Sequence, residues 1–321
     1  MSSQTIFWIV FGVLVVVLLG LDIKVFHKRA HVITIKESLL WTAFWIAIAL
    51  LFNLGIYLVQ GHGPALEYLT CYLIEKSLSV DNLFVFLMVF SYFAVAPAYQ
   101  HKVLFWGIIG AIIMRLAFIE AGVTLLGRFH WVFYIFGAFL IITAIRMAFQ
   151  RERGLKPERN PVFRLVRRFV PVTKDYEGDS FLIKRAGQYI ATPLLVVVVV
   201  IETTDVVFAL DSIPAALAIT LDPFIVYTSN IFAILGLRSL YFALAGVMRL
   251  FHYLHYGLVF ILIFVGVKML LPETYHIPTY IALGVVAGVL IVSVIISIIW
   301  PRKVGSIPAP SVQPGHSKSS E

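Results

Sequence analysis

Long apolar runs separated by short polar segments dominate this sequence. Nine of these runs come close to or exceed roughly 20 mostly apolar residues, the length that an α-helix needs to cross a bilayer. The predicted spans are 6–24, 37–59, 66–94, 101–122, 129–149, 190–217, 223–248, 253–271 and 277–300. The pattern therefore predicts an all-α polytopic membrane protein with about nine transmembrane helices.

The composition agrees with this fold class. Hydrophobic residues make up 60% of the chain and charged residues only 13%, whereas soluble domains carry about 25% charge. Although the net charge is +8, ten of the 25 Lys and Arg residues lie between Arg151 and Arg185, in one predicted loop. No stretch interleaves basic and aromatic residues as a nucleic-acid surface does. We expect the lipid bilayer as a partner and no nucleic acid.

Loop charges predict the orientation of the spans. Basic loops face the cytoplasm, so loop 150–189 is placed there, and segment 24–36, Lys102 and Arg249 then fall on the same side. The connections on the opposite side contain one basic residue, Arg128. The first run has no basic residue before it and no small-residue cleavage site after it, which predicts a retained helix. The expected topology has the N-terminus outside and the C-terminus inside.

These assignments divide the chain into six predicted segments. They are two N-terminal helices (1–59), a first three-helix unit (60–149), a basic cytoplasmic loop (150–189), a second three-helix unit (190–271), a final helix (272–300) and a disordered tail (301–321). The tail is rich in Ser and Pro and has no apolar period. Within the basic loop, the stretch 163–169 mixes apolar and charged residues, which predicts a short amphipathic interfacial helix.

The two three-helix units carry matching polar residues. Two acids six residues apart occur in the third span and again in the sixth, 130 residues later: Glu75 with Asp81, and Asp205 with Asp211. Arg115 recurs as Arg238 at an offset of 123. Because each unit has an odd number of helices, the two copies face opposite ways, as in many secondary transporters. We therefore predict two inverted three-helix repeats.

Five acids fall inside predicted spans: Glu75, Asp81, Glu202, Asp205 and Asp211. Each ionised carboxylate near the bilayer centre costs about 2.5–3.5 kcal/mol, so five bare ones would cost on the order of 12–18 kcal/mol. That is comparable to the whole stability of a typical domain. Protonation, buried cations, water or a bound metal must compensate.

Helical spacing sorts some of these side chains. Glu202 and Asp205 are three residues apart and share a face, and Ser212, seven residues after Asp205, lies on nearly the same face. Glu75 and Asn82 align in the same way. Glu75 and Asp205 are thus each predicted to share a helix face with another polar side chain that lies one or two turns away.

Asp81 and Asp211 are predicted to point about 120° away from their upstream acids on an unbroken helix. Pro214 supplies a reason for a break in the sixth span, because its ring disrupts the hydrogen bond to the Leu210 carbonyl. Such a break would turn Asp211 toward the other acids and free a carbonyl oxygen. The first copy has no proline at this place, so the argument applies to the second copy only.

The predicted ligands all offer oxygen. The metal set is Glu75, Asp81, Asn82, Glu202, Asp205 and Asp211, with Ser212, Pro214, Lys76, Arg115 and Arg238 supporting. An all-oxygen site suits Mg²⁺, Ca²⁺ or Mn²⁺, and ligand chemistry leaves the three open. The cation would be transported cargo, with no permanently bound cofactor.

The alternative interpretation is structural. In it, Lys76, Arg115 and Arg238 neutralise three of the carboxylates and only lock the helices together. Asp22 lies near a helix end and is expected to contact water. Gly110 is expected to be a close-packing position between helices.

Four segments resemble the TerC family of integral membrane proteins, most closely its Alx branch. They are Tyr72–Asn82 (YLIEKSLSVDN), Glu202–Ala215 (ETTDVVFALDSIPA), Asp222–Val226 (DPFIV) and Thr228–Arg238 (TSNIFAILGLR). The resemblance runs from about residue 5 to 300. It implies a bacterial inner-membrane protein linked to manganese export and tellurite resistance, in which the five acids take part in export.

The leading hypothesis is a manganese exporter coupled to inward proton movement. A membrane scaffold that delivers metal to exported proteins or assists their assembly is the second hypothesis. A tellurite-resistance or redox-stress protein without transport is the third. No nucleophile–base pair, phosphate loop or redox motif supports an enzyme, and the single cysteine, Cys71, excludes an internal disulfide. A second copy of the chain as a partner is left open.

Overall fold

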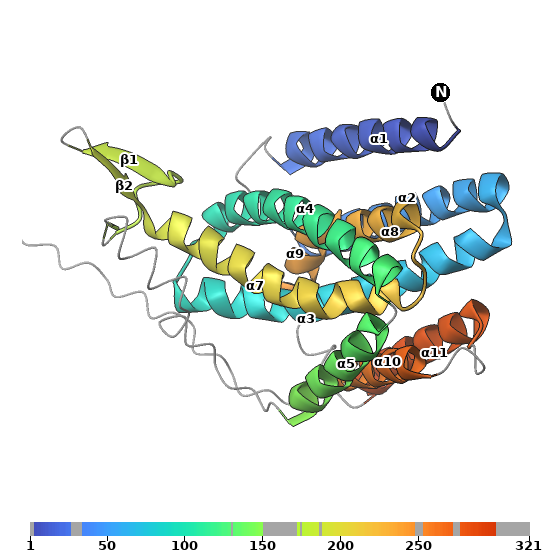
Figure 1. Cartoon of the computed structure of the whole chain (residues 1–321). Helices are drawn as coiled ribbons and strands as arrows, with labels where there is room; N and C mark the ends of the chain where they lie inside the picture. The colour runs from blue at the N-terminus through green and yellow to red at the C-terminus, as the bar shows by residue number, and fades with distance from the viewer. Residues whose placement is uncertain are drawn as a thin grey trace, which may run out of the picture.

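The computed structural model describes residues 3–26, 34–129, 131–149, 172–173, 175–185, 188–247, 253–271 and 277–299. Figure 1 shows these residues as an elongated helical bundle with a small hairpin at one end. The helices are α1 (Ser3–Phe26), α2 (Ile35–Gln60), α3 (His62–Tyr92), α4 (Pro97–Arg128), α5 (Val132–Phe149), α7 (Pro193–Leu217), α8 (Pro223–Ile234), α9 (Leu237–Val247), α10 (Leu254–Leu270) and α11 (Thr279–Ile299). The strands are β1 (Leu182–Arg185) and β2 (Gln188–Ala191).

Within the described residues, each predicted apolar run forms helix over most of its length. In the described part of the chain, six segments are long and apolar enough to cross a membrane, and two shorter apolar helices, Phe7–Asp22 and Leu254–Leu270, accompany them. Helix α3 contains 31 residues, more than the roughly 20 that a bilayer requires. The prediction of an all-α polytopic membrane protein is confirmed. The membrane orientation stays a prediction from the loop charges.

Proline and capping residues mark where several spans begin. Pro97 and Pro193 occupy the first positions of α4 and α7, where a missing backbone N–H costs nothing. Asp222 caps α8, since its carboxylate accepts a hydrogen bond from the Phe224 N–H at 2.9 Å. These local residues explain why the helix starts lie within a few residues of the predicted boundaries.

One predicted span is broken in its middle. The run 223–248 forms α8 and α9, which are separated at Gly236, where φ is +81°. Only glycine adopts this conformation readily, and a Cβ at this position would lie 2.5 Å from Trp45 Cγ of α2. The 12 residues of α8 extend about 18 Å, roughly half of a bilayer core. Irregular backbone therefore lies inside the bundle, near mid-depth of this span.

The break predicted at Pro214 is wrong. Helix α7 continues from Pro193 to Leu217 with Pro214 inside it. The ring lies in the last turn, so the lost hydrogen bond to Leu210 comes where the helix is about to end and costs little. The Pro214 carbonyl accepts from Ala218 N–H at 3.0 Å, which completes the turn.

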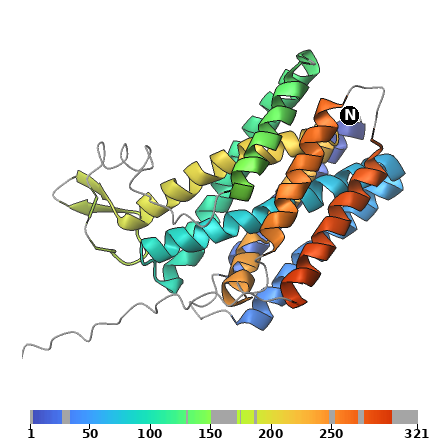
Figure 2. The same cartoon turned by 90° about the horizontal axis from the view of Figure 1, so that it is seen from below.

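The helix packing follows the predicted repeat. Helix α3 packs against α8 and α7, α4 packs against α7, and α5 packs against α10. Exchanging α3 with α7, α4 with α8 and α5 with α10 leaves this set of pairs unchanged. In Figure 1, α3 and α7 run in opposite directions, as inverted units require. In Figure 2, α11 lies beside α10 on the outside of the second unit. These arrangements support the repeat, which remains a prediction.

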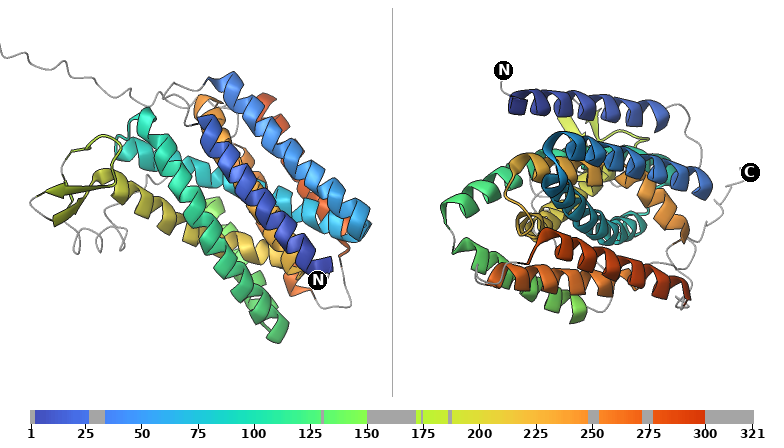
Figure 3. Two further views of the ribbon diagram at one scale, coloured as in Figure 1. Left: turned by 90° about the horizontal axis from the view of Figure 1, so that it is seen from above. Right: turned by 90° about the vertical axis from the view of Figure 1, so that its right-hand side faces the viewer.

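Helix α1 lies along the edge of the bundle, beside α2 (Figure 3). Aromatic side chains attach it: Trp8 lies edge-on to Phe224 of α8 with ring centroids 5.3 Å apart. Phe11 lies 5.9 Å from Phe52 of α2. Much of the remaining surface of α1 is apolar and exposed, as at Val16, which suits contact with lipid.

A hairpin precedes α7 where the sequence predicted only a loop. Strands β1 and β2 pair antiparallel, with Leu182 opposite Ala191. The Tyr176 hydroxyl donates to the Phe93 carbonyl at 2.7 Å, which joins this region to the end of α3. The amphipathic helix predicted at 163–169 and the tail 301–321 lie outside the described residues.

Candidate functional site

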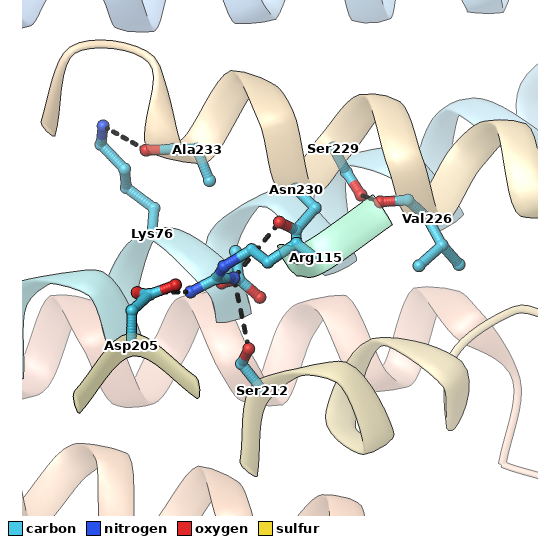
Figure 4. Close-up of polar contacts among 9 residues, drawn as sticks. Lys76, Arg115, Asp205, Ser212, Val226, Ser229, Asn230 and Ala233 are labelled. Carbon is cyan, nitrogen blue, oxygen red and sulfur yellow. Dashed lines mark hydrogen bonds and ion pairs between the residues drawn. The ribbon is translucent and has the colours of Figure 1, made fainter. Parts of the chain in front are cut away.

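A buried arginine joins four helices at the centre of the bundle. Arg115 of α4 forms an ion pair with Glu75 of α3, and its Nη2 lies 3.6 Å from Asp205 Oδ1 of α7. Its Nη1 also donates to Ser212 Oγ at 3.3 Å and to Asn230 Oδ1 of α8 at 3.2 Å. Figure 4 shows the guanidinium between Asp205, Ser212 and Asn230. One cation thus contacts α3, α7 and α8.

The charges around Arg115 are not fully balanced. Glu75 is 1% exposed and Asp205 is 5% exposed, so two buried carboxylates share one guanidinium. Among the described residues, Asp205 Oδ2, Arg115 Nε and Asn230 Nδ2 have no hydrogen-bond partner. An unsatisfied buried polar atom costs about 1–3 kcal/mol. The carboxylate oxygen could therefore bind a cation or accept a hydrogen bond from water, whereas the two N–H groups could only donate to water.

A small cavity adjoins this cluster at the break between α8 and α9. Its volume of about 10 Å³ matches the roughly 10–15 Å³ that one water molecule needs. Its polar lining comes from Ser79, Asn82, Arg115 and Asp205, and Ile234 and Leu237 border it from the two sides of the break. Ser79 Oγ also lacks a hydrogen-bond partner within the described residues. Oxygen atoms from both predicted units meet at this space.

The structure brings together part of the predicted ligand set. Asn82 and Asp205 line the same cavity, and Glu75 lies on the other side of the shared Arg115. Ser212, predicted to share a face with Asp205, contacts the same guanidinium. The spacing argument for these residues is consistent with the geometry.

Glu202 and Asp211 face other helices. The Glu202 carboxylate lies against Gly110 of α4, where a Cβ would overlap it. Asp211 is half-buried and has the Thr143 side chain of α5 as a hydrogen-bond partner. Because α7 is unbroken at Pro214, nothing turns Asp211 toward Arg115.

The side chain of Asp81 lies outside the described residues. Within the part of the chain that is described, no three His, Cys, Asp or Glu side chains gather in a way that would hold a metal ion. The acids whose side chains are described therefore contact other groups and do not gather around one point. Arg115 lies between Glu75 and Asp205 and pairs with both.

Lys76 binds backbone at the broken span. Its Nζ donates to the Ala233 carbonyl of α8 at 3.1 Å (Figure 4). This carbonyl lies one turn before Gly236, where the helix ends and its carbonyls lose their partners. In the alternative structural interpretation Lys76 neutralises a carboxylate, whereas in the structure its ammonium donates to this helix end.

Arg238 also has a partner that the sequence did not indicate. Its Nη2 lies 2.6 Å from Asp22 Oδ2 of α1 and donates to the Asp22 carbonyl at 2.7 Å. Asp22 is 5% exposed, so the prediction that it contacts water is wrong. The reason is that α1 packs on the bundle and buries this end. Arg238 thus pairs with an N-terminal helix.

Two residues of the cluster were missed from sequence. Asn230 and Ser79 lie in apolar spans as small polar residues, and Asn230 belongs to a run of three with Thr228 and Ser229. Polar residues inside a span are rare and mark function. That run was the signal that would have identified Asn230.

Gly110 of α4 was predicted to be a close-packing position, and in the structure it lies in close contact with α7. Gly110 faces the Glu202 carboxylate, and a Cβ at Gly107, one turn earlier, would lie 3.2 Å from Ile201 Cγ2. Small residues let helices approach closely in membranes. The α4–α7 seam that carries Arg115 and Asp205 is therefore tight.

Comparisons with known proteins agree on one family. The model of the integral membrane protein TerC family matches residues 60–304. An uncharacterized membrane protein of Myxococcus xanthus, STKORF319, is 48% identical over 92% of both chains. Proteins named "Putative membrane-bound redox modulator Alx" in Salmonella typhi and Escherichia coli K12 are each 46% identical over 90% of this chain and 93% of their own. No solved structure matches the chain.

Proposed function

Since this chain belongs to the integral membrane protein TerC family, we propose that it is a secondary carrier that exports a divalent metal cation across the bacterial inner membrane. Manganese is the proposed cargo. The family membership and the multiple apolar helices establish a multi-pass membrane protein. The transport activity and its cargo are the proposal.

One observation carries this proposal. Glu75 and Asp205, one from each three-helix unit, meet at Arg115 beside a small polar cavity at a broken helix. Secondary carriers bind cargo near the bilayer midplane, between repeats and at discontinuous helices. Buried acids are expensive in a membrane and commonly mark ion pathways. The cluster contains two buried acids, adjoins a broken helix and joins the two predicted repeats.

The chemistry of the cluster selects the class of cargo. Carboxylates of Glu75 and Asp205, the Asn82 amide and the Ser79 hydroxyl offer oxygen. Hard divalent cations prefer such oxygen ligands. Among these cations, manganese is favoured by the resemblance described from the sequence. A few ligands and some retained water suit an ion that must also be released.

Export requires an energy source. A cytoplasm-negative potential opposes cation exit by about 2.3 kcal/mol per charge per 100 mV, which is about 4.6 kcal/mol for a divalent ion. Inward proton movement is the simplest coupling, and the half-buried acids Glu202 and Asp211 of α7 are the proposed proton carriers. Neither acid forms an ion pair with Arg115 within the described residues, so each could change charge while those ion pairs stay in place.

Flux in proteoliposomes tests the proposal. Purified full-length protein should move Mn²⁺ down its gradient, and an imposed proton gradient in the coupling direction should accelerate this flux. Asp205→Asn should abolish both. The matched control is Asp222→Asn, which changes an exposed helix cap. A wild-type protein that neither binds nor moves Mn²⁺, Mg²⁺ or Ca²⁺ would refute transport.

A second candidate function has one observation in its favour. Arg115 already pairs with Glu75 and Asp205, and no three metal-ligating side chains gather in the described part of the chain. A scaffold for the metalation or assembly of exported proteins would show such a locked bundle. It predicts that Asp205→Asn leaves cellular manganese content unchanged but lowers the amount of active exported metalloenzyme.

A further inference from the structure

We propose that Arg115 is a built-in substitute for the transported cation. It neutralises Glu75 and Asp205 while the carrier is empty, and it withdraws onto Ser212 and Asn230 when a divalent cation enters. This inference deepens the proposed function and rests on it. It assigns Arg115 a role in cation affinity and in the return of the empty carrier, beyond holding helices together.

The contacts of the guanidinium fit this exchange. Nη1 contacts Glu75 and is also within hydrogen-bonding distance of two neutral oxygens, Ser212 Oγ at 3.3 Å and Asn230 Oδ1 at 3.2 Å. Nη2 lies 3.6 Å from Asp205 Oδ1, beyond an ordinary hydrogen bond. The Arg115 guanidinium therefore already lies close to two carboxylates and to two neutral oxygens. Exchanging the carboxylates for the neutral oxygens requires only a shift among contacts that it already makes.

The carboxylates retain open positions for a second cation. Within the described residues, Asp205 Oδ2 has no hydrogen-bond partner, and Asp205 lines the cavity with Asn82 and Ser79. Arg115 lines the same space, so a cation entering it would meet the Asp205 carboxylate and the Arg115 guanidinium together. The cation would therefore compete directly with Arg115 for Asp205.

Charge balance explains why such a residue helps a carrier. Two carboxylates and one guanidinium give a formal charge of −1, and bare carboxylates would be far more costly to carry back across the membrane. When a divalent ion binds, the same group becomes +1 with Arg115 still nearby. This repulsion limits affinity, and a transport site must release its ion as well as bind it.

Arg238 provides the contrast. It holds both the carboxylate and the carbonyl of Asp22 at 2.6 and 2.7 Å, and it is not among the residues that line the cavity. Both arginines are almost fully buried, at 2% and 1% exposure. A variant of Arg238 therefore tests the general cost of losing a buried arginine that does not line the cavity.

The experiment compares Arg115→Gln with Arg238→Gln in the full-length protein. Mn²⁺ binding to detergent-solubilised protein is measured by the electron paramagnetic resonance signal of free Mn²⁺. Net efflux and Mn²⁺/Mn²⁺ exchange are measured in proteoliposomes. We expect Arg115→Gln to bind Mn²⁺ about tenfold more tightly, within the usual range of coupling energies, and to lose net efflux while exchange continues. Arg238→Gln should keep the wild-type affinity and the wild-type ratio of efflux to exchange.

Two results would overturn the inference. One is unchanged or weaker Mn²⁺ binding in Arg115→Gln, and the other is an equal loss of efflux and exchange. If Arg115→Gln does not fold, Arg115→Lys keeps the charge but loses the planar fork, and its ratio of efflux to exchange should still fall. A wild-type ratio in Arg115→Lys would contradict the inference. A wild-type protein that neither binds nor moves Mn²⁺ would instead refute the proposed function.

Discussion

Arg115 and Arg238 occupy matching places in the two predicted three-helix units, 123 residues apart, but their partners differ. Arg115 joins an acid from each unit, whereas Arg238 pairs with Asp22 of α1. Helix α1 lies before the region that the family model covers. The comparison teaches that a repeated charge can be used at the centre of the molecule in one copy and for attaching a peripheral helix in the other.

The second helices of the two units differ as well. Helix α4 is continuous for 32 residues, whereas its counterpart is broken at Gly236 into α8 and α9. At the offset of 123, the residue in α4 that corresponds to Gly236 is Ile113. A β-branched residue does not adopt a positive φ, so α4 has no equivalent break. One unit thus supplies a long rigid helix and the other supplies irregular backbone beside the cavity.

The largest expected effect comes from removing the acid partner of each arginine. Asp22→Asn should lower the free energy of unfolding by about 3–5 kcal/mol, because it removes the buried carboxylate that pairs with Arg238. Glu75→Gln should lower it less, because Asp205 still offsets the charge of Arg115. Only Glu75→Gln should also abolish Mn²⁺ transport. Thermal unfolding in detergent measures the first effect, and proteoliposome flux measures the second.

A double variant sharpens this comparison. Asp22→Asn with Arg238→Gln removes both charges and should recover most of the stability lost in either single variant, as a double-mutant cycle would show. Loss of transport in the double variant, with stability regained, would mean that α1 takes part in function.

A smaller effect is expected from filling the break. Gly236→Ala forces a side chain into a positive φ, which costs about 1–3 kcal/mol, and its Cβ would lie 2.5 Å from Trp45 Cγ. The melting temperature should fall and Mn²⁺ flux should decrease. Gly284→Ala in α11 is the control, because nothing lies within 4 Å of a Cβ there. Equal behaviour of the two variants would contradict a required break.

The α4–α7 seam is expected to be less sensitive. Gly110→Ala places a methyl group where the Glu202 carboxylate lies, and overpacking typically costs about 1–3 kcal/mol. The end of a flexible side chain can move, so we expect the lower part of this range together with slower proton-driven flux. Gly127→Ala in the same helix has open space and should behave as wild type. Proton-driven and metal-gradient-driven flux, measured separately, check the prediction.

The smallest effect is expected at the hairpin end. Lys102 Nζ lies 2.9 Å from Asp179 Oδ2, and both side chains are partly exposed, at 34% and 67%. Lys102→Ala should therefore destabilise by at most about 1 kcal/mol, less in high salt. The hydrogen bond from Lys102 and its charge lower the pKa of Asp179 below the ordinary 3.8.

The sign of the pH effect follows from that lowered pKa. The stabilising contribution of Asp179 is present above its unfolded pKa and is lost as pH falls through its folded pKa. Thermal unfolding of wild type and Lys102→Ala should therefore converge below about pH 3.8. If the difference in melting temperature between the two proteins does not change across this pH range, the ion pair between Lys102 and Asp179 does not contribute to stability.

The sequence by itself determined the helices and the presence of a polar site in the membrane. A run of apolar residues is a local property, so span lengths and fold class could be predicted without knowing any contact. The cost of buried charge is also local in origin, so Glu75, Asp205, Asn82 and Ser212 could be selected as residues that need partners.

Only the tertiary structure decided which partners these residues have. Asp22 and Arg238 are 216 residues apart, and their pairing depends on where α1 packs. The break at Gly236 depends on Trp45 from another helix, while Pro214 is tolerated because it lies in a last turn. Helix rotation and neighbour choice arise from the packing of the whole bundle. No local pattern encodes them, which is why the sequence could select charged groups that need partners but could not name those partners.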